Sequence, residues 1–157
     1  MHSRQNPASA APQRSTQRSA RDDVNSEAAA RRALIVDDDA TDARALTLLL
    51  IAAGHWDYRV VHTAAEAIPA AVEFLPGIIF LDIELPGMSG YDVALLLRQH
   101  AELQGTRLIA LTDDIEHGAR ERARDSGFER YLVKPVADLE LQKVLARDTP
   151  GKRGDRR

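Results

Sequence analysis

Short apolar runs alternate with longer segments of helical periodicity through the middle of the chain. The short runs are predicted to be buried strands at 33–37, 58–62, 78–82, 108–112 and 131–133. The segments that follow them carry apolar residues at helical spacing and are predicted to be helices at 41–53, 64–74, 89–103, 115–126 and 136–146. This alternation predicts an α/β fold, a doubly wound five-stranded parallel sheet with five helices on its two faces.

The two ends of the chain differ from this middle region in composition. In residues 1–32 the only large apolar side chains are Met1 and Val24, among Ser, Gln, Ala, Pro and Arg. Such a segment cannot bury enough surface to offset the entropy of ordering, so we expect a disordered tail over 1–32. The basic segment 149–157 is expected to be disordered for the same reason. One folded domain is therefore expected over 33–148.

The distribution of charge excludes several classes of function. The formal net charge is −3, with +3 at each end of the chain and −9 in the residues between. A nucleic-acid-binding domain would carry its positive charge on the folded body, so no DNA partner is expected. No apolar run is long enough to span a membrane, and no membrane partner is expected. The chain has no cysteine, which excludes disulfides and thiolate chemistry and fits a reducing compartment such as the cytoplasm.

Polar residues that can carry phosphoryl chemistry follow four of the predicted strands. Ligands of doubly wound sheets bind outside the carboxyl ends of the strands. The polar residues at those ends are Asp37, Asp38, Asp39, Asp82, Thr112 and Lys134. Clustered carboxylates repel one another, and Mg²⁺ relieves that repulsion through hard oxygen ligands. Lysine and threonine suit contacts to phosphoryl oxygens, and an aspartate beside a metal can become an aspartyl phosphate.

Four segments resemble the receiver domain of two-component response regulators. They are LIVDDD at 34–39, IIFLDIELPGMSGYD at 78–92, LIALT at 108–112 and YLVKP at 131–135. Successive distances of 45, 30 and 22 residues separate Asp37, Asp82, Thr112 and Lys134, as is typical of that family. The resemblance covers roughly 33–147 and implies a flavodoxin-like, CheY-like fold with strand order 2-1-3-4-5.

The resemblance implies a role for each residue at this edge of the sheet. Asp82 would be the phosphoacceptor, assisted by Thr112 and Lys134. Thr112 and Tyr131 would be the switch residues. Mg²⁺ would be held by three carboxylates and one backbone carbonyl, those of Asp37, Asp38, Asp82 and Glu84 respectively. The peptide bond before Pro135 would be cis.

The same resemblance implies a single-domain response regulator rather than an enzyme with an external substrate. Its phosphoryl donor would be a sensor histidine kinase or a histidine phosphotransfer protein. Only ten residues follow Arg147, so the signal would leave by phosphorylation-dependent protein contact or by phosphorelay to an output protein of unknown identity.

Two other interpretations of the acidic residues stay open. Asp113 follows Thr112 where the family usually has a small residue, and its charge is compatible with a pseudo-receiver that binds partners without phosphorylation. Residues 37–41 also fit the Asp-x-Asp-x-Thr motif of haloacid-dehalogenase-like phosphatases. Those enzymes need a further acidic metal motif after the lysine, whereas only 23 residues follow Lys134. The phosphatase interpretation also leaves Asp82 unexplained.

Overall fold

The computed structural model describes residues 22, 24, 27–54, 56–113 and 118–146 of the chain. The predicted disorder of the tails therefore falls mostly outside the described residues, as does the start of the helix predicted at 115–126. Residues 27–30 are helical, and their backbone lies against Gly77, where an added Cβ would be 2.7 Å from the Ala29 carbonyl oxygen. The limits of the domain remain a prediction.

The five predicted strands form one parallel sheet. Their bounds are Arg32–Val36 (β1), Asp57–Val61 (β2), Ile78–Asp82 (β3), Arg107–Thr112 (β4) and Arg130–Val133 (β5). The order across the sheet is β2-β1-β3-β4-β5, which confirms the predicted order. All five residues of β3 are buried because this strand lies at the centre of the sheet, with helices on both faces.

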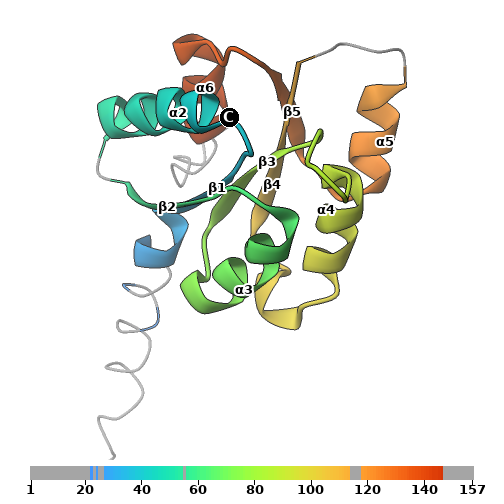
Figure 1. Cartoon of the computed structure of the whole chain (residues 1–157). Helices are drawn as coiled ribbons and strands as arrows, with labels where there is room; N and C mark the ends of the chain where they lie inside the picture. Colours follow the sequence, from blue (N-terminus) through green and yellow to red (C-terminus); the bar gives the residue numbers. More distant parts are fainter. Residues whose placement is uncertain (1–21, 23, 25–26, 55, 114–117, 147–157) are drawn as a thin grey trace, which may run out of the picture.

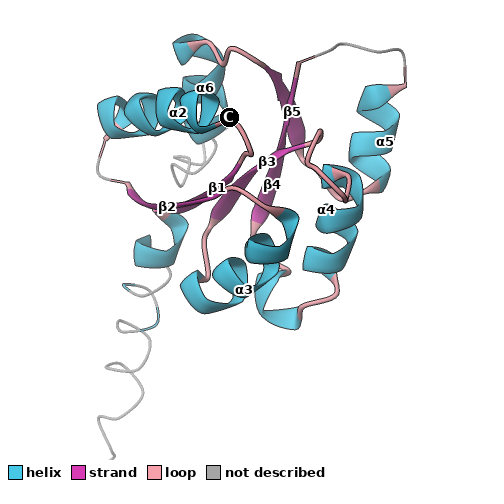
Figure 2. Cartoon of the chain, in the orientation of Figure 1, coloured by secondary structure: helices cyan, strands magenta, loops and turns pink. Residues whose placement is uncertain are grey.

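Besides the helical residues 27–30, the described part of the chain has five α-helices and a 3₁₀ helix, η1, which connect and cover the strands. Their bounds are Ala40–Ala53 (α2), Ala64–Phe74 (α3), Gly90–Arg98 (α4), Ala101–Leu103 (η1), Ala119–Asp125 (α5) and Asp138–Leu145 (α6). Helices α2 and α6 cover one face of the sheet, while α3, α4 and α5 cover the other (Figures 1 and 2). None of the described helices combines the length and hydrophobicity that a membrane crossing requires.

The predicted helix 89–103 is wrong in its last third. Helix α4 ends at Arg98, and the chain turns through an extended His100 before η1. A continuous helix would place Leu103, six residues beyond Leu97, away from the buried stripe. The break buries Leu103 instead, and the Arg98 guanidinium stabilises it by donating a hydrogen bond to the Leu103 carbonyl at 3.0 Å.

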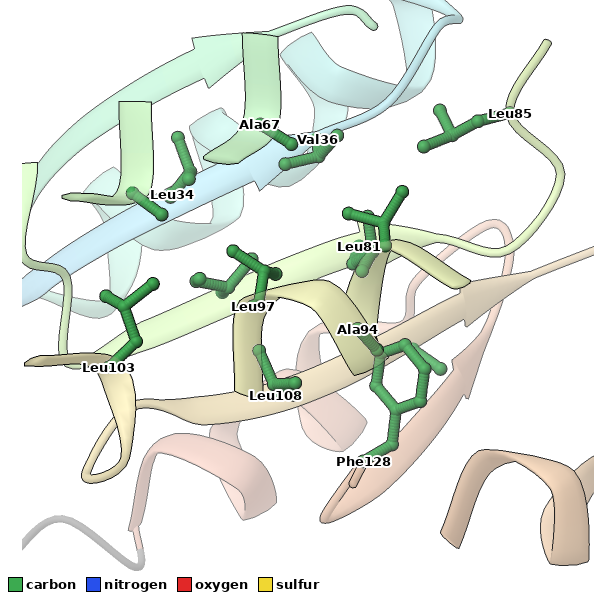
Figure 3. Packing of buried hydrophobic residues seen from close by; sticks show 14 of the residues in the cluster. Leu34, Val36, Ala67, Leu81, Leu85, Ala94, Leu97, Leu103, Leu108 and Phe128 are labelled. Carbon is green, nitrogen blue, oxygen red and sulfur yellow. The ribbon is translucent and has the colours of Figure 1, made fainter. Parts of the chain in front are cut away.

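Alternate residues of the strands supply two hydrophobic cores, one on each face of the sheet. Leu34 and Val36 of β1 pack toward α3 and α4, together with Leu81 and Leu97, as Figure 3 shows. The intervening β1 residues and Phe80 pack toward α2 and α6. Because both faces of the central strands are buried, their carboxyl ends are held in fixed positions, and these ends carry the candidate site.

Candidate functional site

The structure brings together three charged residues that the sequence places at the ends of three different strands. Asp82 is the last residue of β3, whereas Asp37 directly follows β1 and Lys134 directly follows β5. The ammonium nitrogen of Lys134 lies 2.9 Å from Asp37 Oδ2 and 3.3 Å from Asp82 Oδ2. All three side chains are nearly inaccessible, with exposed fractions of 1%, 3% and 6% for Asp37, Asp82 and Lys134. The carboxyl edge of the sheet therefore holds a buried cation between two buried carboxylates.

In each of the two buried carboxylates, Oδ1 accepts a hydrogen bond from a backbone amide and Oδ2 faces Lys134. Asp37 Oδ1 accepts a hydrogen bond from the backbone N–H of Asp39 at 2.9 Å, and Asp82 Oδ1 accepts one from that of Glu84 at 3.0 Å. Such a bond to the amide two residues later is typical of aspartate at the end of an element. It fixes the carboxylate plane, so that Oδ2 of each faces Lys134.

The loop after Asp82 requires a glycine at position 90. The Gly90 amide donates a hydrogen bond to the Ile83 carbonyl at 2.8 Å. A Cβ at this position would lie 2.3 Å from the Asp82 carbonyl oxygen, far inside van der Waals contact. The Ser89 hydroxyl caps α4 directly before this close approach. Gly90 thus lets α4 begin against the end of β3, and this contact holds the loop that follows Asp82.

Asp38 adds a third carboxylate to the group, and this carboxylate is exposed to solvent. One carboxylate oxygen from each of Asp37, Asp38 and Asp82 lies within 4.8 Å of the others, and Asp38 is exposed. The buried Asp37 Oδ2 accepts no well-directed hydrogen bond in spite of its ion pair with Lys134. This all-oxygen set, with one side open to water, fits Mg²⁺, which binds few carboxylates and retains waters. Glu84 contributes its N–H to Asp82, and the contribution of its carbonyl stays a prediction.

Asp39 caps α2 and is not one of the three clustered carboxylates. Its Oδ1 accepts hydrogen bonds from the backbone amides of Thr41 and Asp42 at 2.8 and 3.1 Å. These bonds hold the pKa of the Asp39 carboxyl below its usual value. In the phosphatase motif, the second aspartate and the threonine would belong to the reaction centre, but here Asp39 completes a helix terminus.

Burial controls the protonation of the central pair. Loss of solvent raises the pKa of Asp82 to about 7, although the Glu84 amide and the Lys134 charge both favour the carboxylate. Burial alone would lower the pKa of Lys134, but the contacts with Asp37 and Asp82 outweigh it and raise that pKa above its usual value. Lys134 is therefore a permanent cation, while Asp82 titrates close to neutral pH when no metal is bound.

Thr112 is joined to Lys134 through the backbone. It is buried at the end of β4, and its carbonyl accepts a hydrogen bond from the Lys134 N–H at 2.8 Å. The peptide bond between Lys134 and Pro135 is cis, which confirms the prediction. Asp113, the next residue of the chain, is exposed at the rim of the site.

Tyr131 lies on β5, three residues before Lys134, and contacts α5. The Arg120 guanidinium carbon stands 5.2 Å from the centre of the Tyr131 ring, and its Nε donates a hydrogen bond to the Tyr131 hydroxyl. The side chain is half-buried. Its predicted role as a switch remains a prediction.

Two contacts of the central group were not predicted from the sequence. The His62 ring nitrogen Nδ1 lies 2.9 Å from the Asp37 carbonyl oxygen. Asp42 Oδ2 accepts a hydrogen bond from Lys134 Nζ at 3.3 Å. The position of Asp42 in the first turn of a helix that begins at this edge was a usable signal, because such side chains point back toward the helix N-terminus. Nothing in the sequence distinguished His62 from a surface histidine.

Comparisons with known proteins indicate the same family as the fold and the geometry of the site. The profile of the response regulator receiver domain matches residues 33–146. The DNA-binding response regulator MtrA of Mycolicibacterium paratuberculosis is 36% identical over 111 residues, which are 71% of this chain and 48% of MtrA. The chain thus spans about half the length of that relative. The polar-differentiation response regulator DivK of Brucella ovis is 34% identical over 104 residues, or 66% of this chain and 84% of DivK.

A solved structure shares the fold of this chain. The receiver domain of the sensor histidine kinase PA1611 from Pseudomonas aeruginosa, determined with a magnesium ion coordinated in its active-site cleft, superposes with a TM-score of 0.68. The two share 28% sequence identity, and the match covers 76% of this chain and 97% of that domain. The fold, the sequence match and the acidic edge agree, and the chain belongs to the receiver-domain family of two-component response regulators.

Proposed function

We propose that Asp82 accepts a phosphoryl group from the phosphohistidine of a sensor histidine kinase or a histidine phosphotransfer protein. The observation that carries this proposal is the buried pair Asp37 and Asp82 with Lys134 Nζ between them, at 2.9 and 3.3 Å. A purely structural ion pair has no need of a third, exposed carboxylate at the same point, but Asp38 provides one. The receiver family is a signalling phosphoacceptor family, which supports this assignment.

Groups of this chain and of its donor account for every bond and proton that changes in the transfer. An ionised Asp82 oxygen forms a bond to phosphorus while the phosphorus–nitrogen bond of the phosphohistidine breaks. The imidazole nitrogen keeps the electron pair of that bond and takes up a proton. Lys134 remains protonated because its pKa is raised, so it provides a fixed positive charge beside the transferred group.

The metal ligands we propose are the carboxylates of Asp37, Asp38 and Asp82, with the Glu84 backbone carbonyl as a fourth group. When bound, Mg²⁺ would neutralise the charge that gathers between the carboxylates and the phosphoryl oxygens. The magnesium ion in the Pseudomonas receiver domain supports this proposal, as does the all-oxygen donor set of the site.

The output we propose is a change in protein contacts at the surface that contains Tyr131. Thr112 would follow the phosphoryl group, and Tyr131 would exchange its contact with Arg120 for a more buried position. The match to MtrA covers 48% of that DNA-binding response regulator, so we do not carry DNA binding over to this chain. Phosphorylation-dependent protein contact and onward phosphorelay are both compatible with the site.

The test is incubation with acetyl phosphate and Mg²⁺, followed by intact-mass measurement. We expect one base-labile phosphate on the native chain and none on Asp82→Asn. The matched control is Asp92→Asn, which alters an exposed aspartate in the first turn of α4 and should be phosphorylated like the native chain. An unchanged phosphate on Asp82→Asn would show that another residue is the acceptor. Turnover of phosphate esters would favour the phosphatase interpretation, and neither activity would favour a pseudo-receiver.

A further inference from the structure

Lys134 contacts a third carboxylate that lies outside the phosphoacceptor motif. Its Nζ donates a hydrogen bond to Asp42 Oδ2 at 3.3 Å, a distance equal to that from Nζ to Asp82 Oδ2. The ammonium group has three donors, and the three carboxylates of Asp37, Asp42 and Asp82 surround it. The family motif includes two of them and makes no use of Asp42.

The first turn of α2 explains why Asp42 reaches the lysine. Asp39 caps this helix and binds the Asp42 amide, which fixes the backbone of Asp42 as the third helical residue. The side chain points back along the helix toward the carboxyl edge of the sheet. A small cavity of about 50 Å³ lies beside the contact, lined by Asp37, Asp42, Lys134 and apolar side chains of α2 and the β5–α6 loop.

The three carboxylates differ in what the proposed reaction requires of them. Asp82 would carry the phosphoryl group, and Asp37 would turn toward the cation. Both therefore change their interactions with Lys134 during the reaction. Asp42 belongs to neither role, so its contact with Lys134 can persist through the transfer. Its side chain is 38% exposed, against 1% for that of Asp37, so solvent reaches the Asp42 carboxylate while it contacts Lys134.

We propose that Asp42 is a positioning residue that holds the Lys134 ammonium group between α2 and the phosphoacceptor. This inference rests on the proposed function, since its effect on rate requires that Asp82 accepts phosphate. It acts through Lys134, because among the described residues the Asp42 carboxylate has its hydrogen bond and its ion pair with Lys134 Nζ. Without Asp42, Lys134 would keep its charge but would lose one of the three carboxylates that hold its ammonium group in place.

The chain contains a closely matched control for this proposal. Asp92 occupies the same third position of α4, after the cap residue Ser89, and α4 also begins at the carboxyl edge. Both aspartates therefore interact with a helix dipole in the same way. Asp92 is exposed and has no ion pair within the described residues. A difference between the two substitutions thus reports the contact with Lys134 rather than the loss of a helix-terminal charge.

The test combines phosphorylation kinetics with the NMR signal of the lysine. We expect Asp42→Ala to lower the saturating rate of phosphorylation by acetyl phosphate about fivefold, the size expected for the loss of one partly exposed ion pair. Asp42→Asn keeps an acceptor oxygen and should restore part of that rate, while Asp92→Ala should match the native chain. The ¹⁵Nζ resonance of Lys134 should shift in Asp42→Ala and stay in place in Asp92→Ala.

The possible outcomes distinguish a failure of the positioning role of Asp42 from a failure of the proposed function. If the native chain takes up no phosphate, the proposed function fails, and the role of Asp42 fails with it. If the native chain is phosphorylated and Asp42→Ala reacts at the native rate or faster, only the positioning role is overturned. An unshifted Lys134 resonance in a folded Asp42→Ala would likewise overturn it. Asp42→Asn preserves side-chain shape and tests the role if the alanine variant fails to fold.

Discussion

The acidic centre and the surface formed by α5 and β5 both include a residue of β5 or of its end, but the two regions are held in opposite ways. In the acidic centre, Lys134 is buried between two carboxylates, each of which is also fixed by a backbone amide. On the other surface, Tyr131 is half-buried and is held by the guanidinium of the exposed Arg120. Helix α5 has seven residues, and Ala123 is its one buried residue.

Under the proposed function, this difference indicates which part of the domain would respond to phosphorylation of Asp82. Cation–π contacts at exposed sites contribute about 0.5–1 kcal/mol each, so the Tyr131 surface can rearrange at little cost. The acidic centre cannot move far without disturbing the buried strands. Two features connect the two regions: the short backbone segment Leu132 and Val133 between Tyr131 and Lys134, and the hydrogen bond from the Lys134 amide to the Thr112 carbonyl. A rigid centre would therefore bias a weakly held surface.

The largest effect we expect concerns the burial of Asp82. Its folded-state pKa of about 7 exceeds its ordinary value of 3.8, so between these pH values the folded chain holds a proton that the unfolded chain has lost. Stability from this group is complete below about pH 4 and is lost as the pH rises through 7. Asp82→Asn removes that titration. Relative to the native chain, its free energy of unfolding should rise by about 2 kcal/mol from pH 5 to pH 8.

Urea denaturation of both proteins in EDTA at several pH values measures this effect. EDTA keeps metal out of the site, so that only proton binding changes. A constant difference between the two proteins across this pH range would show that Asp82 has an ordinary pKa and that the centre is more hydrated than its burial indicates.

A smaller effect is expected at the rim of the acidic centre. A carboxylate about 6 Å from an incoming phosphoryl group repels each unit of charge by roughly 0.7 kcal/mol in water and 2.8 kcal/mol at a dielectric of 20. Since Asp113 is exposed, we expect about 1 kcal/mol, and Asp113→Ala should react several-fold faster with acetyl phosphate. Added salt should narrow the gap. Equal or slower phosphorylation of Asp113→Ala by acetyl phosphate would contradict this repulsion. If Asp113→Ala reacts more slowly only when the donor is the kinase, Asp113 helps to recruit that kinase.

The smallest effect is expected on the Tyr131 surface. Arg120→Ala removes the cation–π contact and the hydrogen bond to the Tyr131 hydroxyl, and should lower the free energy of unfolding by less than about 1 kcal/mol. The aromatic NMR resonances of Tyr131 should nevertheless change, because the ring loses its cation–π contact with Arg120. Arg124→Ala on the same helix is the control. A cost above about 2 kcal/mol for Arg120→Ala would mean that this surface is as rigid as the acidic centre.

The regular parts of this fold could be predicted from the sequence, since hydrophobic runs determine the strands. Each strand begins within one residue of its predicted start, and the carboxyl ends follow from the parallel topology. The break after Arg98 was missed because it depends on where Leu103 finds a buried position, and that position is set by the tertiary packing. The predicted site residues Asp37, Asp82 and Lys134 came together because each lies at the carboxyl end of a strand, and these ends could be predicted from the sequence.

Side-chain contacts made from helices and loops were beyond the reach of the sequence. Asp37, Asp38 and Asp39 are adjacent in the chain, but one is buried, one is exposed beside it and one caps α2. Local turn geometry decides among these positions. The contacts of Asp42 with Lys134 and of His62 with Asp37 depend likewise on how α2 and the end of β2 approach the sheet edge.

The central claim, that Asp82 is the residue modified, has a direct chemical test. The chain is phosphorylated with acetyl phosphate and Mg²⁺ and then reduced with borohydride, which converts an aspartyl phosphate to homoserine, and its peptides are sequenced by mass spectrometry. We predict homoserine at position 82 and unmodified aspartate at positions 37, 38 and 42. Homoserine at any of those other positions, with aspartate retained at 82, would contradict the account.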